Sequence, residues 1–154
     1  IKNKKSFNIN NSNDVSLNHK IDTIHASILI EKLRGLNQVL QKREKIAKYY
    51  TKHLNHLIAK QTLKSGEIHG RYLFLGRFKN RNKLKSFLNE KDIETKVFYS
   101  PLVSDAKIYK NCKKYTLKNS KKILKEILAL PFHENLNLKQ IKYVVKQIKK
   151  FYEK

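Results

Sequence analysis

Residues 127–152 read ILALPFHENLNLKQIKYVVKQIKKFY and carry the clearest structural signals of the chain. Asn137 and Gln140 have the spacing of a capping box, and Leu136 lies where it can pack on Ile141 as a hydrophobic staple. An apolar stripe at helical steps follows the cap: Ile141, Val144, Val145, Ile148 and Tyr152. The pattern predicts a helix with one buried face, and the preceding run ILALP is consistent with a short strand that Pro131 ends.

Helical periodicity also marks the first half of the chain. Asp22 is placed to cap a helix whose apolar positions are Ile21, Ile24, Ile28, Leu29 and Leu33. After a bend at Gly35, a second apolar stripe follows: Leu36, Val39, Leu40, Ile46, Tyr50, Leu54 and Leu57. These spacings predict two long helices, each with a face to bury.

Between the helical parts, two short segments have the composition of strands. Residues 72–78 (YLFLGRF) are aromatic and apolar without helical period, and residues 93–99 (IETKVFY) place Ile93, Val97 and Tyr99 at even spacing before Pro101. A short helix is expected around Leu84, Phe87 and Leu88, and another over Ile123, Leu124, Ile127 and Leu128. The chain is therefore predicted to be of the α/β class, an α+β layer of long helices packed on a small sheet.

So small a sheet cannot bury every apolar side chain in this pattern. We expect part of the stripe formed by Val39, Ile46, Tyr50, Leu54 and Leu57, together with the aromatic residues 72–78, to stay exposed on the isolated domain.

The composition limits the kinds of partner. The 154 residues carry a net charge of +23, but only five of the 35 basic residues are arginines. Lysine, asparagine and isoleucine are abundant together, as AT-rich codons produce, and the scarcity of arginine disfavours nucleic acid as a partner. No stretch has the length of a membrane span, and no signal peptide is visible, so we expect no membrane partner. Cys112 is the single cysteine, which favours a reducing compartment, the cytoplasm.

The sequence contains none of the familiar catalytic motifs that we searched for. The four glycines, at 35, 66, 70 and 76, match neither a phosphate-binding loop nor a dinucleotide fingerprint. His53 and His56 share a helix face without a carboxylate nearby, so no metal site is expected. Taken alone, the residues indicate a basic α+β domain without a self-contained active site.

Three segments, in order, resemble one family. They are SLNHKIDTIHASILIEKL (residues 16–33), FKNRNKLKSFLNEKDIETKVFYSPL (residues 78–102) and residues 127–152. Their order and spacing are similar to the PLP-dependent sugar-nucleotide aminotransferases of the DegT/DnrJ/StrS type. The resemblance covers the C-terminal part of this fold-type I family. It implies that residues 16–154 form the small domain and that residues 1–15 form a lead-in loop from a large domain outside this chain.

The resemblance also implies roles for single residues. Asn18 matches the asparagine that reaches the PLP phosphate of the neighbouring subunit in a homodimer, although Asn is also an ordinary turn residue before a helix. Lys20 stands where the family has an arginine that contacts phosphate or substrate, and lysine keeps the charge but loses the bidentate geometry. Tyr99 falls beside the sugar-nucleotide site, where a half-buried structural tyrosine is the alternative, and Phe98 replaces the family's histidine.

The reaction implied by the resemblance transfers an amino group from glutamate to a nucleotide-linked keto-sugar. None of the 30 lysines stands in the family's Schiff-base motif, so no catalytic residue is assigned and the chain alone is expected to be inactive. Its start without methionine suggests a piece of something longer. Two alternatives remain: a non-enzymatic basic module that pairs with a separate PLP-domain polypeptide or an acidic partner, and, less favoured, a nucleic-acid-binding protein.

Overall fold

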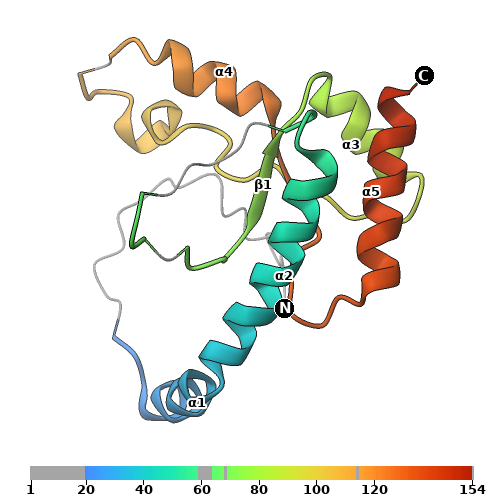
Figure 1. The fold of residues 1–154 in the computed structure, drawn as a ribbon. Coiled ribbons are helices and arrows are strands. Elements are labelled where there is room, and N and C mark those ends of the chain that lie inside the picture. The colour runs from blue at the N-terminus through green and yellow to red at the C-terminus, as the bar shows by residue number, and fades with distance from the viewer. Residues whose placement is uncertain (1–19, 59–63, 68, 114, 154) are drawn as a thin grey trace, which may run out of the picture.

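The structure is a computed structural model that describes residues 20–58, 64–67, 69–113 and 115–153 (Figure 1). Its elements, in chain order, are α1 (Thr23–Arg34), α2 (Leu36–Leu54), β1 (Phe74–Arg77), α3 (Arg81–Asn89), the 3-10 turns η1 (Val103–Asp105) and η2 (Lys107–Tyr109), α4 (Lys118–Glu126), β2 (Ile127–Leu130) and α5 (Leu138–Tyr152). The predicted class, helices packed on a small sheet, is confirmed. The proposed boundary between a lead-in loop (1–15) and a small domain (16–154) lies outside the described residues.

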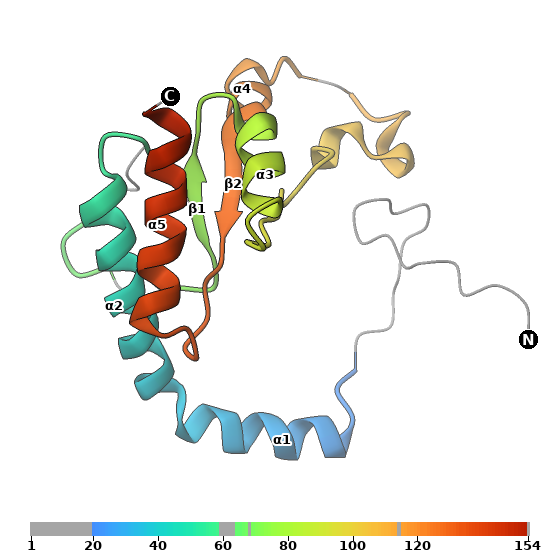
Figure 2. The same cartoon turned by 90° about the vertical axis from the view of Figure 1, so that its right-hand side faces the viewer.

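The sheet is an antiparallel pair of strands. Phe74 of β1 lies opposite Leu130 of β2, and Arg77 lies opposite Ile127 (Figure 2). Gly76 is needed at its place in β1, because a Cβ atom there would collide with the ring of Phe78. The ring of Phe78 therefore packs directly against the backbone of β1 at Gly76.

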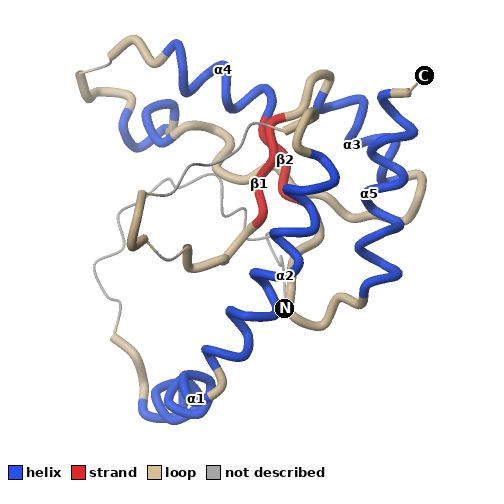
Figure 3. The backbone as a smooth tube through the Cα atoms, viewed as in Figure 1, coloured by secondary structure: helices blue, strands red, loops and turns tan. Residues whose placement is uncertain are grey.

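Three helices cover one face of this hairpin and bury the core against it (Figure 3). The largest fully buried side chains are Tyr50 and Leu54 from α2, Leu84 and Leu88 from α3, Leu128 from β2, Ile148 from α5, and Phe78. The predicted capping box of α5 is confirmed, since Asn137 accepts a hydrogen bond from the Gln140 amide at 2.9 Å and the Gln140 side chain accepts one from the Asn137 amide at 3.0 Å.

The expected exposure of the second apolar stripe is wrong at its centre. Ile46, Tyr50 and Leu54 are buried, because α2 packs against α5 and shares one core with the hairpin. The exposed apolar surface lies instead on α1, none of whose residues is buried, and α1 projects away from the helices and strands of the core (Figure 2). Its exposed side chains, with those just beside it, are Ile21, Ile24, Ile28, Leu29, Ile30, Leu33 and Leu36.

The strand expected at residues 93–99 is reduced to one bridge, in which Lys96 and Ala129 exchange two backbone hydrogen bonds. Antiparallel pairing would next join residue 94 to Pro131 and residue 98 to Ile127. Pro131 has no N–H to donate, and the Ile127 N–H is already bonded to the carbonyl of Ile123 at the end of α4. The free edge of β2 therefore offers a partner at a single position.

Two further boundaries differ from the expectation. β2 (Ile127–Leu130) confirms the short strand expected in the run ILALP. Ile127 and Leu128 therefore do not continue the preceding helix, since α4 ends at Glu126, whose carbonyl accepts a hydrogen bond from the Phe78 amide. The first strand begins at Phe74 rather than at Tyr72, which is 71% exposed.

Candidate functional site

The first predicted site segment lies at the start of α1. Lys20 is exposed, two residues before Asp22, and Asn18 lies outside the described residues. Asp22 caps α1 as predicted, accepting a hydrogen bond from the His25 amide at 2.9 Å, and its second carboxylate oxygen contacts His25 Nδ1. These contacts, first the amide and then the ring of His25, lower the pKa of Asp22. A negative charge therefore occupies the N-terminus of α1.

The second predicted site residue, Tyr99, has an unusual backbone. Its φ is +62°, a left-handed conformation that costs free energy for a side chain of this size. The side chain is 63% exposed, so it is not the half-buried structural tyrosine that was the alternative. Its ring centroid lies 5.9 Å from that of Phe98, over which the Lys96 Nζ atom lies at 5.7 Å. Strained and exposed aromatic residues of this kind are typical of functional positions.

The structure does not bring Lys20 and Tyr99 together. Lys20 lies at the far end of the projecting α1, whereas Tyr99 begins the segment that leads toward η1 and η2, and these segments lie apart in both views (Figures 1 and 2). Within one chain the two predicted residues therefore form no common site.

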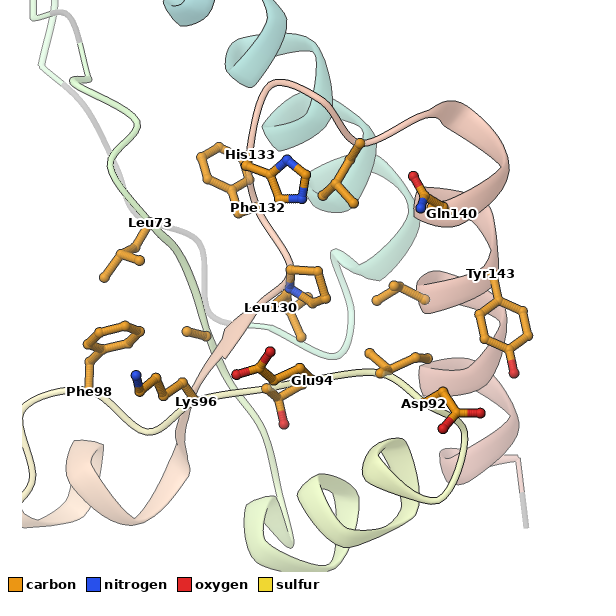
Figure 4. Close-up of a pocket in the computed structure, with 16 residues that line it drawn as sticks. Leu73, Asp92, Glu94, Lys96, Phe98, Leu130, Phe132, His133, Gln140 and Tyr143 are labelled. Carbon is orange, nitrogen blue, oxygen red and sulfur yellow. The ribbon is translucent and has the colours of Figure 1, made fainter. Parts of the chain in front are cut away.

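Sequence analysis did not predict a pocket of about 440 Å³ that lies between residues 92–98 and the N-terminal half of α5. Figure 4 shows Leu73 and Phe98 on one side of it, and Gln140 and Tyr143 of α5 on the other. Apolar side chains form most of the wall, and Glu94, Lys96 and His133 add polar groups. Thr95 lines the pocket while its buried Oγ1 atom has no hydrogen-bond partner. The alternation Glu94, Thr95, Lys96 was the available signal, but only the fold supplies the α5 wall.

Arginine side chains connect the segments around these sites. Arg71 bonds Glu44 of α2 at 2.5 Å, and this hydrogen bond is the main reason that the pKa of Glu44 is lowered. Arg77 bonds Glu126 at 2.6 and 2.9 Å. Arg81 donates to the carbonyls of Leu124 and Ile127, both at 3.1 Å. These arginines hold loops and strands in place.

The part of the chain that the structure describes holds neither a membrane-spanning helix nor a group of metal-binding side chains. No helix there is long and apolar enough to cross a bilayer. Nor do its His, Cys, Asp and Glu residues gather in a group of three or more that could hold a metal ion.

The comparisons with known proteins agree on one family. The model of the DegT/DnrJ/EryC1/StrS aminotransferase family matches residues 1–149. A curated relative, dTDP-3-amino-3,6-dideoxy-alpha-D-galactopyranose transaminase of Aneurinibacillus thermoaerophilus, is 28% identical over 136 residues, which cover 88% of this chain and 38% of the relative.

Solved structures match in fold. A DegT/DnrJ/EryC1/StrS aminotransferase from Brucella abortus superposes with a TM-score of 0.79 at 25% identity, over 88% of this chain and 37% of that one. The protein Spr1654 from Streptococcus pneumoniae, in a structure described as its PLP form, gives a TM-score of 0.72 at 24% identity, over 84% of this chain and 35% of that one. This chain thus spans less than two fifths of the length of each.

The resemblance seen in three segments of sequence is therefore confirmed over nearly the whole length of this chain. The fold is that of part of a fold-type I aminotransferase. The chain belongs to the DegT/DnrJ/EryC1/StrS aminotransferase family.

Proposed function

We propose that this chain forms the small domain of a PLP-dependent aminotransferase that transfers an amino group from glutamate to a nucleotide-linked keto-sugar. The observation that carries the proposal is the family match over residues 1–149, supported by the transaminase relative. In this proposal the working enzyme is a homodimer, and the lysine that binds PLP covalently comes from sequence outside this chain.

Among the parts of PLP, only the phosphate group finds suitable contacts among the described residues. The His25 amide at the N-terminus of α1 is already bonded to the Asp22 carboxylate, so this amide is not free for a phosphate group. The exposed ammonium group of Lys20 suits a dianion. PLP, when bound, supplies the electron sink that lets an amino group pass between an amino acid and a carbonyl compound.

In the proposed enzyme, the residues of this chain bind and orient. Asn18 would hold the phosphate of the PLP bound to the neighbouring subunit, and Lys20 would contact phosphate or substrate with its ammonium group. Tyr99 would present its ring and hydroxyl to the sugar nucleotide, because its left-handed backbone turns the side chain out of the domain at 63% exposure. Phe98 has no acid or base to offer, so proton transfer is assigned to groups outside this chain.

A chimera tests the proposal. The part of the Aneurinibacillus relative that precedes the matched region is fused to this chain, and the chimera is given dTDP-3-amino-3,6-dideoxy-alpha-D-galactopyranose and 2-oxoglutarate. We expect glutamate to form. A chimera that folds and takes up PLP but forms no glutamate would contradict the proposal.

Variants of the same chimera test the assigned roles. Lys20→Gln should weaken the binding of the sugar nucleotide or of PLP about tenfold, since a charge-assisted contact to an anionic group is lost. Lys139→Gln, an exposed lysine on α5, is the matched control and should leave PLP binding unchanged. Tyr99→Phe should raise the KM for the sugar nucleotide with a smaller effect on kcat.

A further inference from the structure

A second surface of the molecule is strongly charged and stands apart from the proposed site residue Lys20. We define the basic lobe as residues 100–125, which contain η1, η2 and α4 up to Lys125. This stretch of sequence holds eight lysines and one acidic residue, Asp105. The seven lysines that the structure describes are all exposed: Lys107, Lys110, Lys113, Lys118, Lys121, Lys122 and Lys125. The net charge per residue of the lobe is about twice that of the rest of the chain.

Four of these seven lysines form one ridge. The positions on α4 are spaced by three, one and three residues, which places them on one side of a helix. They are Lys118, Lys121, Lys122 and Lys125. Glu126, at the end of the same helix, does not neutralise them, because its carboxylate is bonded to Arg77. The ridge therefore presents unbalanced positive charge to solvent.

Apolar and aromatic side chains are exposed on the same lobe. Val103 is 73% exposed and Tyr115 is 72% exposed, and Tyr109 and Ile123 are also exposed. The lobe lies at the edge of the molecule in both ribbon views (Figures 1 and 2). Nothing of the described core therefore covers these side chains, although exposing them to water costs free energy.

We propose that the basic lobe docks on the surface of a bilayer that contains anionic lipids. Lysine clusters are attracted to anionic headgroups, and aliphatic and tyrosine side chains enter the interfacial region. Binding at a bilayer surface grows with the buried apolar area and with the attraction to anionic lipids, and the lobe offers both. The expectation of no membrane partner rested on the lack of a spanning segment, and a docking surface needs none.

Nucleic acid is the competing polyanion, and two observations disfavour it. The lobe contains no arginine, the residue best suited to phosphate and base edges, and the adjacent Arg81 is bonded to backbone carbonyls. An exposed aliphatic side chain such as Val103 has no role against a phosphate backbone, whereas a bilayer interface takes it up.

Co-sedimentation of the whole chain with lipid vesicles tests the proposal. We expect binding to vesicles of phosphatidylcholine mixed with phosphatidylglycerol, no binding to pure phosphatidylcholine, and weaker binding as salt is raised. Absence of binding to the anionic vesicles at about 0.1 M salt, where the screening length is still about 10 Å, overturns the proposal.

Two variants that lose the same charge distinguish binding through the lobe from binding through the net charge of the whole chain. The lobe variant combines K118Q, K121Q, K122Q and K125Q, and the control combines K139Q, K142Q, K146Q and K150Q on the exposed side of α5. Both lose the same charge. We expect the lobe variant to bind the anionic vesicles at least about tenfold more weakly and the control to bind within about twofold of the wild type. Equal loss in both variants overturns the proposal.

A third variant distinguishes a bilayer from nucleic acid as the partner of the lobe. Val103→Ser combined with Tyr115→Ser changes only exposed side chains, so the fold is retained. It should weaken vesicle binding at least about threefold and leave the residual, salt-sensitive binding to duplex DNA unchanged. Tighter binding to duplex DNA than to anionic vesicles at the same salt concentration overturns the proposal.

Discussion

The hydroxyl group of Tyr50 donates a 2.9 Å hydrogen bond to the carbonyl of Pro131. It joins α2 to the residue that follows β2, across 81 positions of sequence. The Tyr50 side chain is fully buried and its ring centroid lies 4.9 Å from that of Phe74 in β1. One side chain thus connects α2 to β1 and to the residue that follows β2.

Tyr50→Phe should lower the free energy of unfolding by about 1–3 kcal/mol. The substitution keeps the ring but leaves the buried Pro131 carbonyl without its donor. Urea denaturation measures the change. Tyr143→Phe is the matched control, because its hydroxyl is exposed and makes a long 3.4 Å contact with the carbonyl of Lys91. If both variants were equally stable, the buried hydrogen bond would contribute nothing.

Arg81→Ala should also destabilise the fold, by about 1–3 kcal/mol. Two carbonyls at the junction of α4 and β2 would lose a charged donor. Lys83→Ala, on the exposed side of the same helix, should change stability by less than about 0.5 kcal/mol. The midpoints of urea denaturation measure the stability of both variants. A larger loss of stability in Lys83→Ala than in Arg81→Ala would refute the assigned role of Arg81.

Stability should fall in alkaline solution through Tyr152. Burial raises the pKa of its hydroxyl to about 12, from 10.0, and the hydroxyl donates to the Lys79 carbonyl at 2.6 Å. Because the folded state holds the proton more tightly, this contribution is complete below pH 10 and is lost as the pH rises from 10 to about 12. Burial raises the pKa of Tyr50 as well, which extends the loss to higher pH.

The measurement is the urea midpoint as a function of pH across this range. Tyr152→Phe should flatten the alkaline fall, whereas Tyr115→Phe, which changes a 72% exposed side chain, should follow the wild type. Identical curves for all three proteins would show that burial of Tyr152 does not govern alkaline stability.

The apolar surface of α1 should make the isolated chain self-associate. Charge repulsion from +23 opposes this contact, so added salt should promote association. Ile24→Ser combined with Ile28→Ser should abolish it, because these side chains are 73% and 50% exposed. Val103→Ser combined with Tyr115→Ser removes as many exposed side chains elsewhere and should not. Sedimentation velocity at rising ionic strength measures the effect, and a wild-type chain that stays monomeric throughout contradicts it.

The chain alone should form no specific covalent adduct with PLP. Borohydride reduction after mixing, followed by peptide mapping, should show scattered low modification over many of the 30 lysines. A single lysine modified stoichiometrically would show that this chain carries its own PLP-binding lysine.

The features that sequence alone predicted depend on neighbours along the chain. The capping box of α5 joins residues three positions apart, and the cap of α1 at Asp22 and the apolar stripe of α2 are equally local. Helix-forming spacing and side-chain capping act within one or two turns, so they can be recognised without the fold. The family resemblance was likewise visible, because whole segments kept their order.

What the sequence could not decide depends on partners far along the chain. Ile127 and Leu128 fit a helical stripe, but pairing with β1, some fifty residues earlier, makes them a strand. Residues 93–99 have the alternation of a strand, yet the edge of β2 offers only Ala129, because Pro131 lacks an N–H and that of Ile127 is taken. The apolar stripe of α1 could be predicted from its spacing, but only the structure shows that the core does not extend to α1 and leaves the stripe exposed. Periodicity states which face is apolar, and only tertiary packing determines what that face meets.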